Sequence, residues 1–356
     1  MDKIGRYLNY LRLALFPLSY GIVGALMGST HNRVLIVDIC FAAVWVGFFF
    51  AASDLIAPIR VWLGYRSDGF QIFGRRREPY IILGGLITGI SILLVTRLSI
   101  TGEVTNTIIL LSILLAFVVY GIGRNLAHNT FQALLADKFH GGSRPRAVTG
   151  YEVATVLCLI VGAGALSGAL SDYNAAQLMS VAIAIATITF ILTIIGAIVQ
   201  EPRTEKMAVA TEKAREMPFS KAFKEVVWAD RQVRLFFLLI MFAFVGTLAQ
   251  DVFLEPYGGL VLGMDIGETA ALTQFWGVGL IISMLISGWV LIRWFGYMRV
   301  LRIGLIVSVV VFIGIIAAGA VGNVNLFRIL VLVMGLGTGL AGAGMLSIII
   351  NFTSNL

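Results

Sequence analysis

The sequence predicts an all-α protein that crosses a membrane about ten times. Its mean hydropathy is +0.94, and only 13% of its 356 residues are charged. A soluble domain carries about a quarter charged residues. The apolar stretches also reach the roughly 18 residues that identify a membrane-spanning helix. We therefore expect a polytopic membrane protein rather than a soluble domain with a large core.

The apolar stretches divide the chain into two expected halves. The expected spans cover 12–30, 34–63, 79–97, 105–136, 147–170, 176–199, 234–254, 269–292, 300–321 and 327–351. One long polar stretch, 200–234, follows the sixth span. We therefore expect an N-terminal six-helix bundle over 1–200, a cytoplasmic linker over 201–233, and a C-terminal bundle with four helices over 234–356.

Basic residues lie almost entirely on one side of the expected bundle. The side that includes the N-terminus and every second loop holds 21 of the 26 Lys and Arg residues. Because positively charged loops remain in the cytoplasm, we expect a cytoplasmic N-terminus. The net charge of +7 then reflects topology and attraction to lipid headgroups, not nucleic-acid binding. Cys40 and Cys158 both lie in apolar runs and predict neither a disulfide framework nor a metal site.

A charged loop between the second and third expected spans recurs later in the chain. Residues 64–80 read GYRSDGFQIFGRRREPY, and residues 287–302 read SGWVLIRWFGYMRVLR. Both stretches combine glycines with arginines, and they lie six spans apart. This period is expected of two parallel six-helix halves. These features resemble the major facilitator superfamily, which implies a helical bundle with two pseudo-symmetric halves and twelve helices, of which this chain supplies about ten.

That resemblance implies a conformational latch at the cytoplasmic ends of the helices. In the alternative interpretation, the charges only fix the topology. An aspartate within the second span is a further gate candidate, and its alternative is a structural ion pair. The candidate gate or latch residues are Asp54, Arg66, Asp68, Arg75, Arg76, Arg144 and Arg146.

Four longer segments point to one branch of that superfamily. They are NRVLIVDI (32–39), RSDGFQIFGRRREPYI (66–81), ADKFHGGSRPRAVTGYEV (136–153) and QDVFLEPYGGLVLGMDIGETAALTQFW (250–276). In combination and in this order they resemble the PucC/LhaA family, also called the bacteriochlorophyll-delivery family. Members with twelve helices would extend beyond this sequence, so we expect either a shortened member or an incomplete C-terminal bundle.

The family resemblance implies a membrane assembly factor. Such a protein would deliver or shield chlorophyll or bacteriochlorophyll, with carotenoid as a further candidate, while light-harvesting complexes assemble in a bacterial inner (intracytoplasmic) or thylakoid membrane. Implied partners are membrane lipid, light-harvesting polypeptides, and reaction-centre or chlorophyll-synthesis proteins. Two alternatives remain open: a proton-coupled secondary transporter of a small solute, and a non-transporting structural subunit of a photosynthetic complex.

Enzymatic activity is not expected from this sequence. It shows no Ser–His–acid arrangement, no metal-spaced Cys/His cluster and no pair of aspartate-rich prenyl-diphosphate motifs. Its glycine-rich spans lack the lysine and the strand–turn–helix context of a phosphate-binding loop. We therefore expect neither a nucleotide nor a structural metal.

Polar residues within the fourth expected span are the first candidates for a binding site, because polar groups in a membrane are costly unless paired. These residues are Arg124, Asn125, His128, Asn129 and Gln132. One interpretation is a cavity lining in which His128 is the axial ligand of a chlorophyll magnesium. The alternative is a histidine that forms a hydrogen bond and packs against a neighbouring helix.

The end of the seventh expected span is the second candidate region. Its residues are Gln250, Asp251, Glu255 and Tyr257, with Trp276 on the next span. Asp251 and Glu255 lie one helical turn apart and share a face. They predict proton coupling or pigment binding, and the alternative is a fold element that orders the following loop. Pro256 is expected to end this helix.

Overall fold

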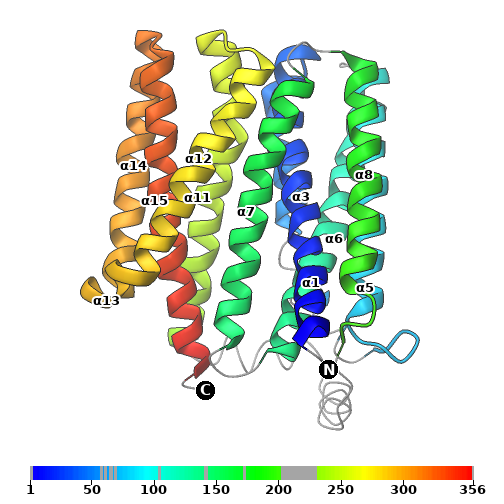
Figure 1. The fold of residues 1–356 in the computed structure, drawn as a ribbon. Coiled ribbons are helices and arrows are strands. Elements are labelled where there is room, and N and C mark those ends of the chain that lie inside the picture. The colour runs from blue at the N-terminus through cyan, green and yellow to red at the C-terminus, as the bar shows by residue number, and fades with distance from the viewer. Residues whose placement is uncertain are drawn as a thin grey trace. The chain divides into compact units, whose positions relative to one another are not determined.

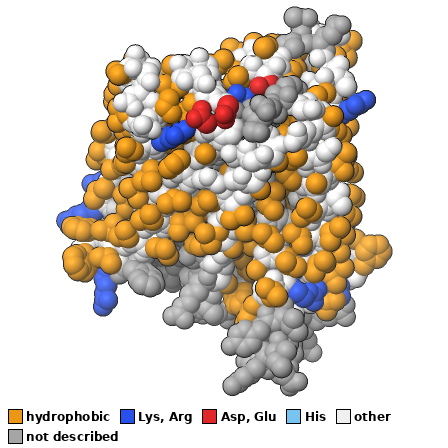
Figure 2. All heavy atoms as spheres, turned by 45° about the horizontal axis from the view of Figure 1, so that its top comes forward, with side chains coloured by type: hydrophobic (Ala, Val, Ile, Leu, Met, Phe, Trp, Pro, Cys, Tyr) orange, Lys and Arg blue, Asp and Glu red, His pale blue; other side chains and the backbone are white. Residues whose placement is uncertain are grey.

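The computed structural model describes residues 3–56, 59, 62–63, 67, 70–102, 106–139, 143–170, 174–201 and 231–354. Eight helices in this part of the chain are long and apolar enough to cross a membrane, and Ala43–Leu55 is a shorter apolar helix. Hydrophobic side chains cover most of the face shown in Figure 2, as expected of a surface that meets lipid. The protein is therefore a helical integral membrane protein, as the sequence predicts.

Figure 1 shows the helices, among which η denotes a π-helical segment. They are α1 (Lys3–Gly24), η1 (Ala25–Thr30), α2 (His31–Arg33), η2 (Val34–Asp38), α3 (Ala43–Leu55), α5 (Glu78–Thr101), α6 (Thr107–Lys138), α7 (Ser143–Ala169), α8 (Ala175–Ala197), α11 (Arg231–Leu262), α12 (Ile266–Ile286), η4 (Ser287–Leu291), α13 (Ile292–Phe295), α14 (Tyr297–Val321) and α15 (Val324–Ser354).

The chain forms two compact units. Unit 1 consists of Met1–Val23, Ile39–Ala154 and Ala175–Ala243, and unit 2 consists of Gly24–Asp38, Thr155–Asn174 and Phe244–Leu356. The division between the units crosses the first helical run, α7 and α11. The two expected halves instead meet at the linker over 201–233. Most of the predicted linker over 201–233 lies outside the described residues.

The first helical run is longer than the sequence predicts. We expected a break near 31–33 because the polar residues there interrupt the apolar pattern. Helical structure instead continues from Lys3 to Asp38 through the two π-helical segments. Arg33 and Asp38 form an ion pair, so the polar stretch is accommodated within the protein. The chain turns afterwards at 39–42, where Cys40 has a φ of 64°.

The expected end of a helix at Pro256 is wrong. Helix α11 continues through this proline to Leu262. Prolines are tolerated within membrane helices because neighbouring groups satisfy the backbone carbonyl that the proline leaves without a donor. The helix ends instead at Gly263, whose φ is 67° and which suits a left-handed C-terminal turn. The Met264 N–H then donates to the Gly258 carbonyl at 3.1 Å.

The two glycines of the repeated loops share a conformation that supports their equivalence. Gly74 has a φ of 71° and Gly296 has a φ of 77°. Side chains other than glycine rarely adopt this region. Glycine at these two positions therefore allows the chain to turn in both loops.

Close approach of α5 and α6 organises the packing of unit 1. A Cβ atom built on Gly84 would lie 2.6 Å from the Ala127 backbone nitrogen and 2.8 Å from the Gly123 carbonyl oxygen. A Cβ atom on Gly123 would lie 2.8 Å from the Thr88 backbone nitrogen. The two helices therefore meet backbone to backbone, which small residues permit in membrane proteins.

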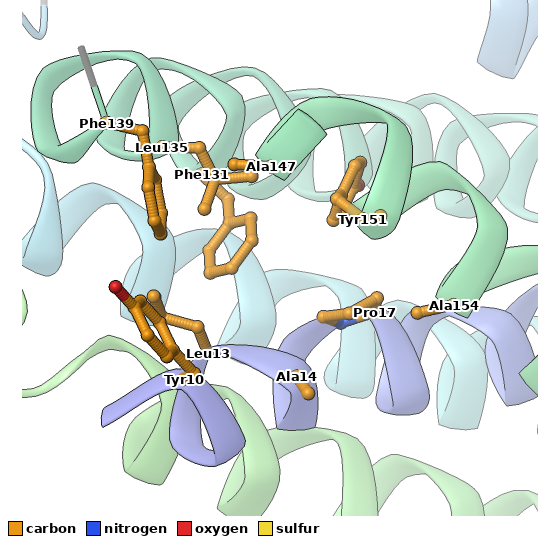
Figure 3. A pocket seen from close by; sticks show the side chains of 11 residues that line it. Tyr10, Leu13, Ala14, Pro17, Phe131, Leu135, Phe139, Ala147, Tyr151 and Ala154 are labelled. Carbon is orange, nitrogen blue, oxygen red and sulfur yellow. The ribbon is translucent and has the colours of Figure 1, made fainter. Parts of the chain in front are cut away.

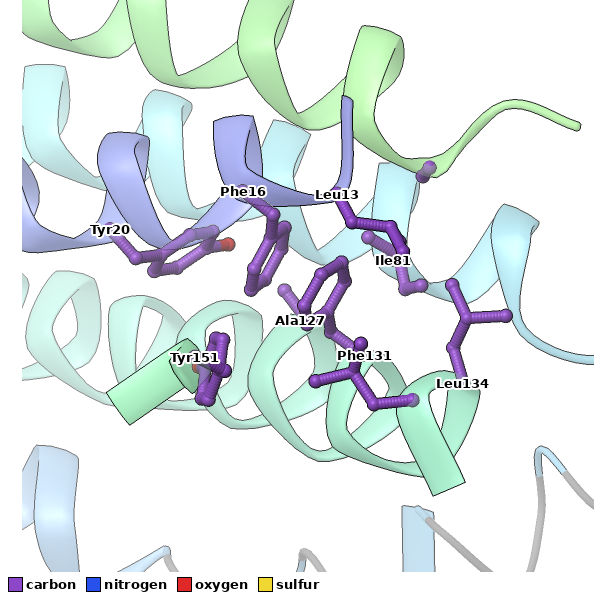
Figure 4. Close-up of a cluster of buried hydrophobic side chains, with 10 residues drawn as sticks. Leu13, Phe16, Tyr20, Ile81, Ala127, Phe131, Leu134 and Tyr151 are labelled. Atoms are coloured by element: carbon purple, nitrogen blue, oxygen red, sulfur yellow. The ribbon is translucent and has the colours of Figure 1, made fainter. Parts of the chain in front are cut away.

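A buried hydrophobic cluster lies beside this contact and joins α1, α5, α6, α7 and α8 (Figure 4). Phe16, Tyr20 and Phe131 are among its members. In unit 2, a second cluster joins α11, α12, α14 and α15 and includes Val311, Phe327 and Met334. Each unit thus has its own hydrophobic core.

We predict that Gly84→Ala destabilises the protein, because the added methyl group must push two backbones apart. The expected loss is about 1–3 kcal/mol. Gly47→Ala is the matched control, since nothing lies within 4 Å of its Cβ position in α3. That control should change stability by no more than about 1 kcal/mol. Thermal unfolding of the detergent-solubilised variants measures both, and equal melting temperatures would contradict the backbone contact.

Candidate functional site

A half-open pocket of about 160 Å³ lies in unit 1 between α1, α6 and α7 (Figure 3). Its lining residues are mostly aliphatic or aromatic, and none is charged. They are Tyr10, Leu13, Ala14, Pro17, Phe131, Leu135, Phe139, Ala147, Gly150, Tyr151 and Ala154.

Stacked aromatic rings form the walls of this pocket. The Tyr10 and Phe139 ring centres lie 5.8 Å apart, at an interplanar angle of 24°. The Phe131 ring stacks on Phe16 at 4.1 Å and lies 5.4 Å from Tyr151. Because these rings fix one another from three helices, the pocket has a rigid apolar wall.

His128 lies behind the pocket, where Tyr151 joins it to the lining. The Tyr151 hydroxyl and His128 Nδ1 share a hydrogen bond. The imidazole also packs edge-on against Tyr20, with ring centres 4.6 Å apart, and against Phe16 at 5.8 Å. This arrangement matches the interpretation of His128 as a packed, hydrogen-bonded residue. Its role as a magnesium ligand stays a prediction.

The other predicted polar residues of α6 form separate contacts. Arg124 forms an ion pair with Asp54 of α3, and its guanidinium carbon lies 5.6 Å from the centre of the Tyr120 ring. Gln132 donates to Glu152 of α7 at 3.0 Å. These side chains therefore join α6 to its neighbours. Asn125 is buried and Asn129 is partly buried on the same helix.

Two carboxylates, those of Glu78 and Glu201, accept hydrogen bonds from backbone N–H groups near the start of α5 and the end of α8. Glu78 accepts hydrogen bonds from the backbone N–H groups of Val199, Gln200 and Glu201 at 3.0, 2.8 and 2.8 Å. Glu201 accepts in return from the N–H groups of Arg76 and Arg77 at 2.9 and 3.0 Å. Hydrogen bonds that involve a charged partner are stronger than neutral ones. The exchange therefore holds the two segments together.

Arginine side chains extend this network to the end of α6. Arg77 Nε lies 3.1 Å from Asp137, and Arg76 lies 3.4 Å from the same carboxylate. Arg76 also lies 3.6 Å from Glu201, and Arg75 pairs with Glu78. The predicted pairing of loop arginines across neighbouring helix ends is present for Arg76 and Arg77. Their partners Asp137 and Glu201 carry no signal in the sequence.

The remaining latch candidates cannot be placed in this network. Arg66 and Asp68 lie outside the described residues. Arg144 and Arg146 belong to the first turn of α7, and their side chains lie outside the described part of the structure. Their predicted role as latch residues stays a prediction.

In unit 2 the structure brings together two of the segments that carry the family resemblance. A Cβ atom on Gly259 would lie 3.0 Å from Val37 and 3.7 Å from Arg33 Nε. Arg33 also donates to the Met264 carbonyl oxygen at 3.4 Å. NRVLIVDI (32–39) and the LEPYGG part of 250–276 thus pack against each other. Glycine at 259 allows this approach.

The second set of predicted residues is also part of unit 2. Glu255 is buried and accepts a hydrogen bond from the Thr273 hydroxyl at 2.7 Å. The Tyr257 hydroxyl donates to the Ile316 carbonyl oxygen at 3.2 Å, and its ring stacks on Phe327 at 6.0 Å. Trp276 packs against the same hydrophobic cluster. Gln250 and Asp251 belong to α11, but their side chains lie outside the described part of the structure.

His31 is a buried polar residue that no motif in the sequence marks. Its side chain is fully buried, and neither ring nitrogen has a hydrogen-bond partner among the described residues. It lies between two π-helical segments, which often occur at functional sites. The apolar pattern predicts a break between spans at 31–33, so a buried histidine is not expected there.

The fold is that of major facilitator transporters. The nucleoside transporter NupG matches with a TM-score of 0.63 and 13% identity, covering 95% of this chain and 80% of NupG. A D-xylose–proton symporter matches with a TM-score of 0.67 and 16% identity, covering 94% of this chain and 80% of the symporter. A further match is described as a major facilitator superfamily symporter. At these identities the likeness concerns the fold alone.

Within this class, the family model described as PUCC protein matches residues 30–355. The chain therefore belongs to the PucC family, as the sequence motifs predict. Protein PucC of Cereibacter sphaeroides is 31% identical over 348 residues, which cover 95% of this chain and 74% of that protein. An uncharacterized protein from the puhA-bchM intergenic region of Rhodobacter capsulatus is 30% identical over 347 residues, covering 95% and 72%.

A third relative carries a name that refers to pigment. The bacteriochlorophyll synthase 44.5 kDa chain of Rhodobacter capsulatus is 27% identical over 282 residues. The match covers 79% of this chain and 64% of that relative.

We predict that Glu78→Gln destabilises unit 1. The amide NH₂ group would meet backbone N–H groups that now donate to a carboxylate oxygen, so donors would face donors. The expected loss is about 1–3 kcal/mol. Thermal unfolding in detergent measures it.

Glu268→Gln is the matched control for this variant. Glu268 pairs with Arg328 at 2.9 Å, at a more exposed site. Glutamine also preserves the capping box that Glu268 forms with Asp265. The control should cost less than about 1 kcal/mol. Equal losses of stability in the two variants would contradict the importance of the backbone hydrogen bonds to Glu78.

Proposed function

We propose that this protein is a membrane assembly factor that delivers or shields chlorophyll or bacteriochlorophyll while light-harvesting complexes assemble. In this role it would contact light-harvesting polypeptides, reaction-centre proteins or enzymes of chlorophyll synthesis. It would act in a bacterial inner (intracytoplasmic) or thylakoid membrane with its N-terminus in the cytoplasm. Catalysis is not part of this proposal.

The observation that carries the proposal is the uncharged, aromatic-walled pocket of unit 1 in a member of the PucC family. Pockets that take apolar molecules, or the apolar part of a larger molecule, are lined in this way, with few polar groups. A site for a sugar or another small polar solute would need several hydrogen-bonding side chains, because each polar group of the solute loses water on entry. The name of the relative with 27% identity supports a pigment as the apolar molecule.

A proton-coupled transporter of a small solute is the second candidate. It is favoured by the ion pair between Asp54 and Arg124, which joins α3 and α6 within the apolar part of unit 1. Ionisable groups at such depth often belong to substrate or proton pathways. A non-transporting structural subunit is the third candidate, and it would be found at a fixed ratio in the mature complex.

Deletion of the gene from the organism that encodes it tests the proposed function. We expect light-harvesting complexes to fall to a small fraction of their normal level, while transcripts of the antenna polypeptides remain unchanged. Complementation with the wild-type gene should restore them. Absorption spectra of isolated membranes measure the level of the complexes. Normal antenna levels in the deletion strain would contradict the assembly role.

A further inference from the structure

We infer that the pocket of unit 1 holds the isoprenoid tail of a tetrapyrrole pigment, while the macrocycle stays outside it. This inference rests on the proposed function and assigns one part of the pigment to one set of side chains. The tail of such a pigment is a long branched hydrocarbon joined to the ring by an ester. A site for the tail would let the protein bind the pigment without a ligand to the magnesium ion of the pigment.

The size of the pocket decides which part of the pigment it can take. Its volume of about 160 Å³ lies well below the roughly 300–1,000 Å³ of pockets that enclose a drug-sized ligand. A macrocycle of four pyrrole rings joined by one-carbon bridges is at least as large as such a ligand and does not fit within this volume. A segment of hydrocarbon chain is narrow enough to do so.

The lining of the pocket suits a hydrocarbon. None of its residues carries a charge, and the tyrosine at its inner end, Tyr151, shares its hydroxyl hydrogen bond with His128. Burial of a chain against such a surface is favourable in proportion to the apolar area removed from water. The stacked Phe16 and Phe131 rings keep the inner wall in place.

The same lining argues against a phospholipid as the occupant. A phosphate headgroup held at the mouth of the pocket would pair best with a cation. Among the described cations beside the pocket, Arg12 donates to the carbonyl oxygens of Ile195 and Ile198, and Lys138 donates to Gln200. A tetrapyrrole with an esterified tail needs no cationic partner, because it has no phosphate group.

Small residues on two helices leave the space that forms the pocket. Ala147, Gly150 and Ala154 recur on one face of α7, and Ala14 and Pro17 lie on α1 opposite them (Figure 3). Gly150 is exposed, and nothing lies within 4 Å of its Cβ position. A larger side chain at this position would therefore fill the pocket without a clash with the backbone or the core.

This geometry defines a substitution that blocks the pocket and a control on the same helix. Gly150→Leu fills the pocket. Gly168→Leu places the same side chain at another exposed glycine of α7 with open space around its Cβ position, away from the pocket. Both replace a helical glycine, so both should favour the helix to a similar extent.

The experiment titrates the protein in detergent with bacteriochlorophyll a and, separately, with the methyl ester of bacteriochlorophyllide a, which keeps a neutral ester but lacks the tail. The shift of the long-wavelength absorption band reports binding. Wild-type protein should bind the tailed pigment about tenfold or more tightly than the tailless one, because several methylene groups are buried. Gly150→Leu should remove this preference, and Gly168→Leu should retain it.

The possible results separate this inference from the function on which it rests. Equal affinity of the two pigments for the wild type, or a tail preference that survives in Gly150→Leu, overturns the tail site but leaves pigment binding intact. A loss of tightly bound phospholipid from Gly150→Leu, with pigment affinity unchanged, assigns the pocket to lipid and also overturns it. Absence of saturable binding of both pigments contradicts the proposed function and, with it, the tail site.

Discussion

The exchange of backbone hydrogen bonds between Glu78 and Glu201 is the interaction on which the arrangement of unit 1 depends. Each carboxylate accepts from the N–H groups of the opposite segment, so the start of α5 and the end of α8 are joined in both directions. Buried backbone groups and buried charges are costly when they are unpaired, and these hydrogen bonds pair both kinds of group.

Helices α1 and α6 of unit 1 are joined to the same network at the start of α5 and the end of α8. Arg76 and Arg77 reach Asp137 at the end of α6. Lys138 reaches Gln200, and Arg12 of α1 donates to the carbonyl oxygens of Ile195 and Ile198 at the end of α8. The pocket is built from α1, α6 and α7, and two of these helices are therefore anchored through the network. A change in the network would reach the pocket through helix position, without direct contact.

The sequence predicts the helices of this protein better than it predicts the contacts between them. Hydropathy locates the membrane spans because lipid excludes polar side chains from long stretches of the chain. The same rule failed at 31–33, where a polar segment remains helical because its ion pair and its burial occur within the protein. It failed again at Pro256, because neighbouring groups in a bundle can compensate for a proline.

None of the binding-site residues that the sequence predicts lines the pocket. The polar face of α6 is visible in the sequence, and its partners Asp54, Tyr151 and Glu152 emerge only when helices distant in the chain are brought together. The pocket itself has no sequence signal, since its lining consists of ordinary apolar residues and one exposed glycine. Glu201 was part of an expected linker, and its role appears only when it is placed beside Arg76.

The absorption spectrum of the protein, gently purified from its native membrane together with its copurifying partners, tests the central claim most directly. Pigment handling predicts a tetrapyrrole band that migrates with the protein, and light-harvesting or pigment-synthesis proteins in the same fraction. A colourless preparation without such partners, obtained under conditions that preserve other pigment–protein complexes, would contradict this account.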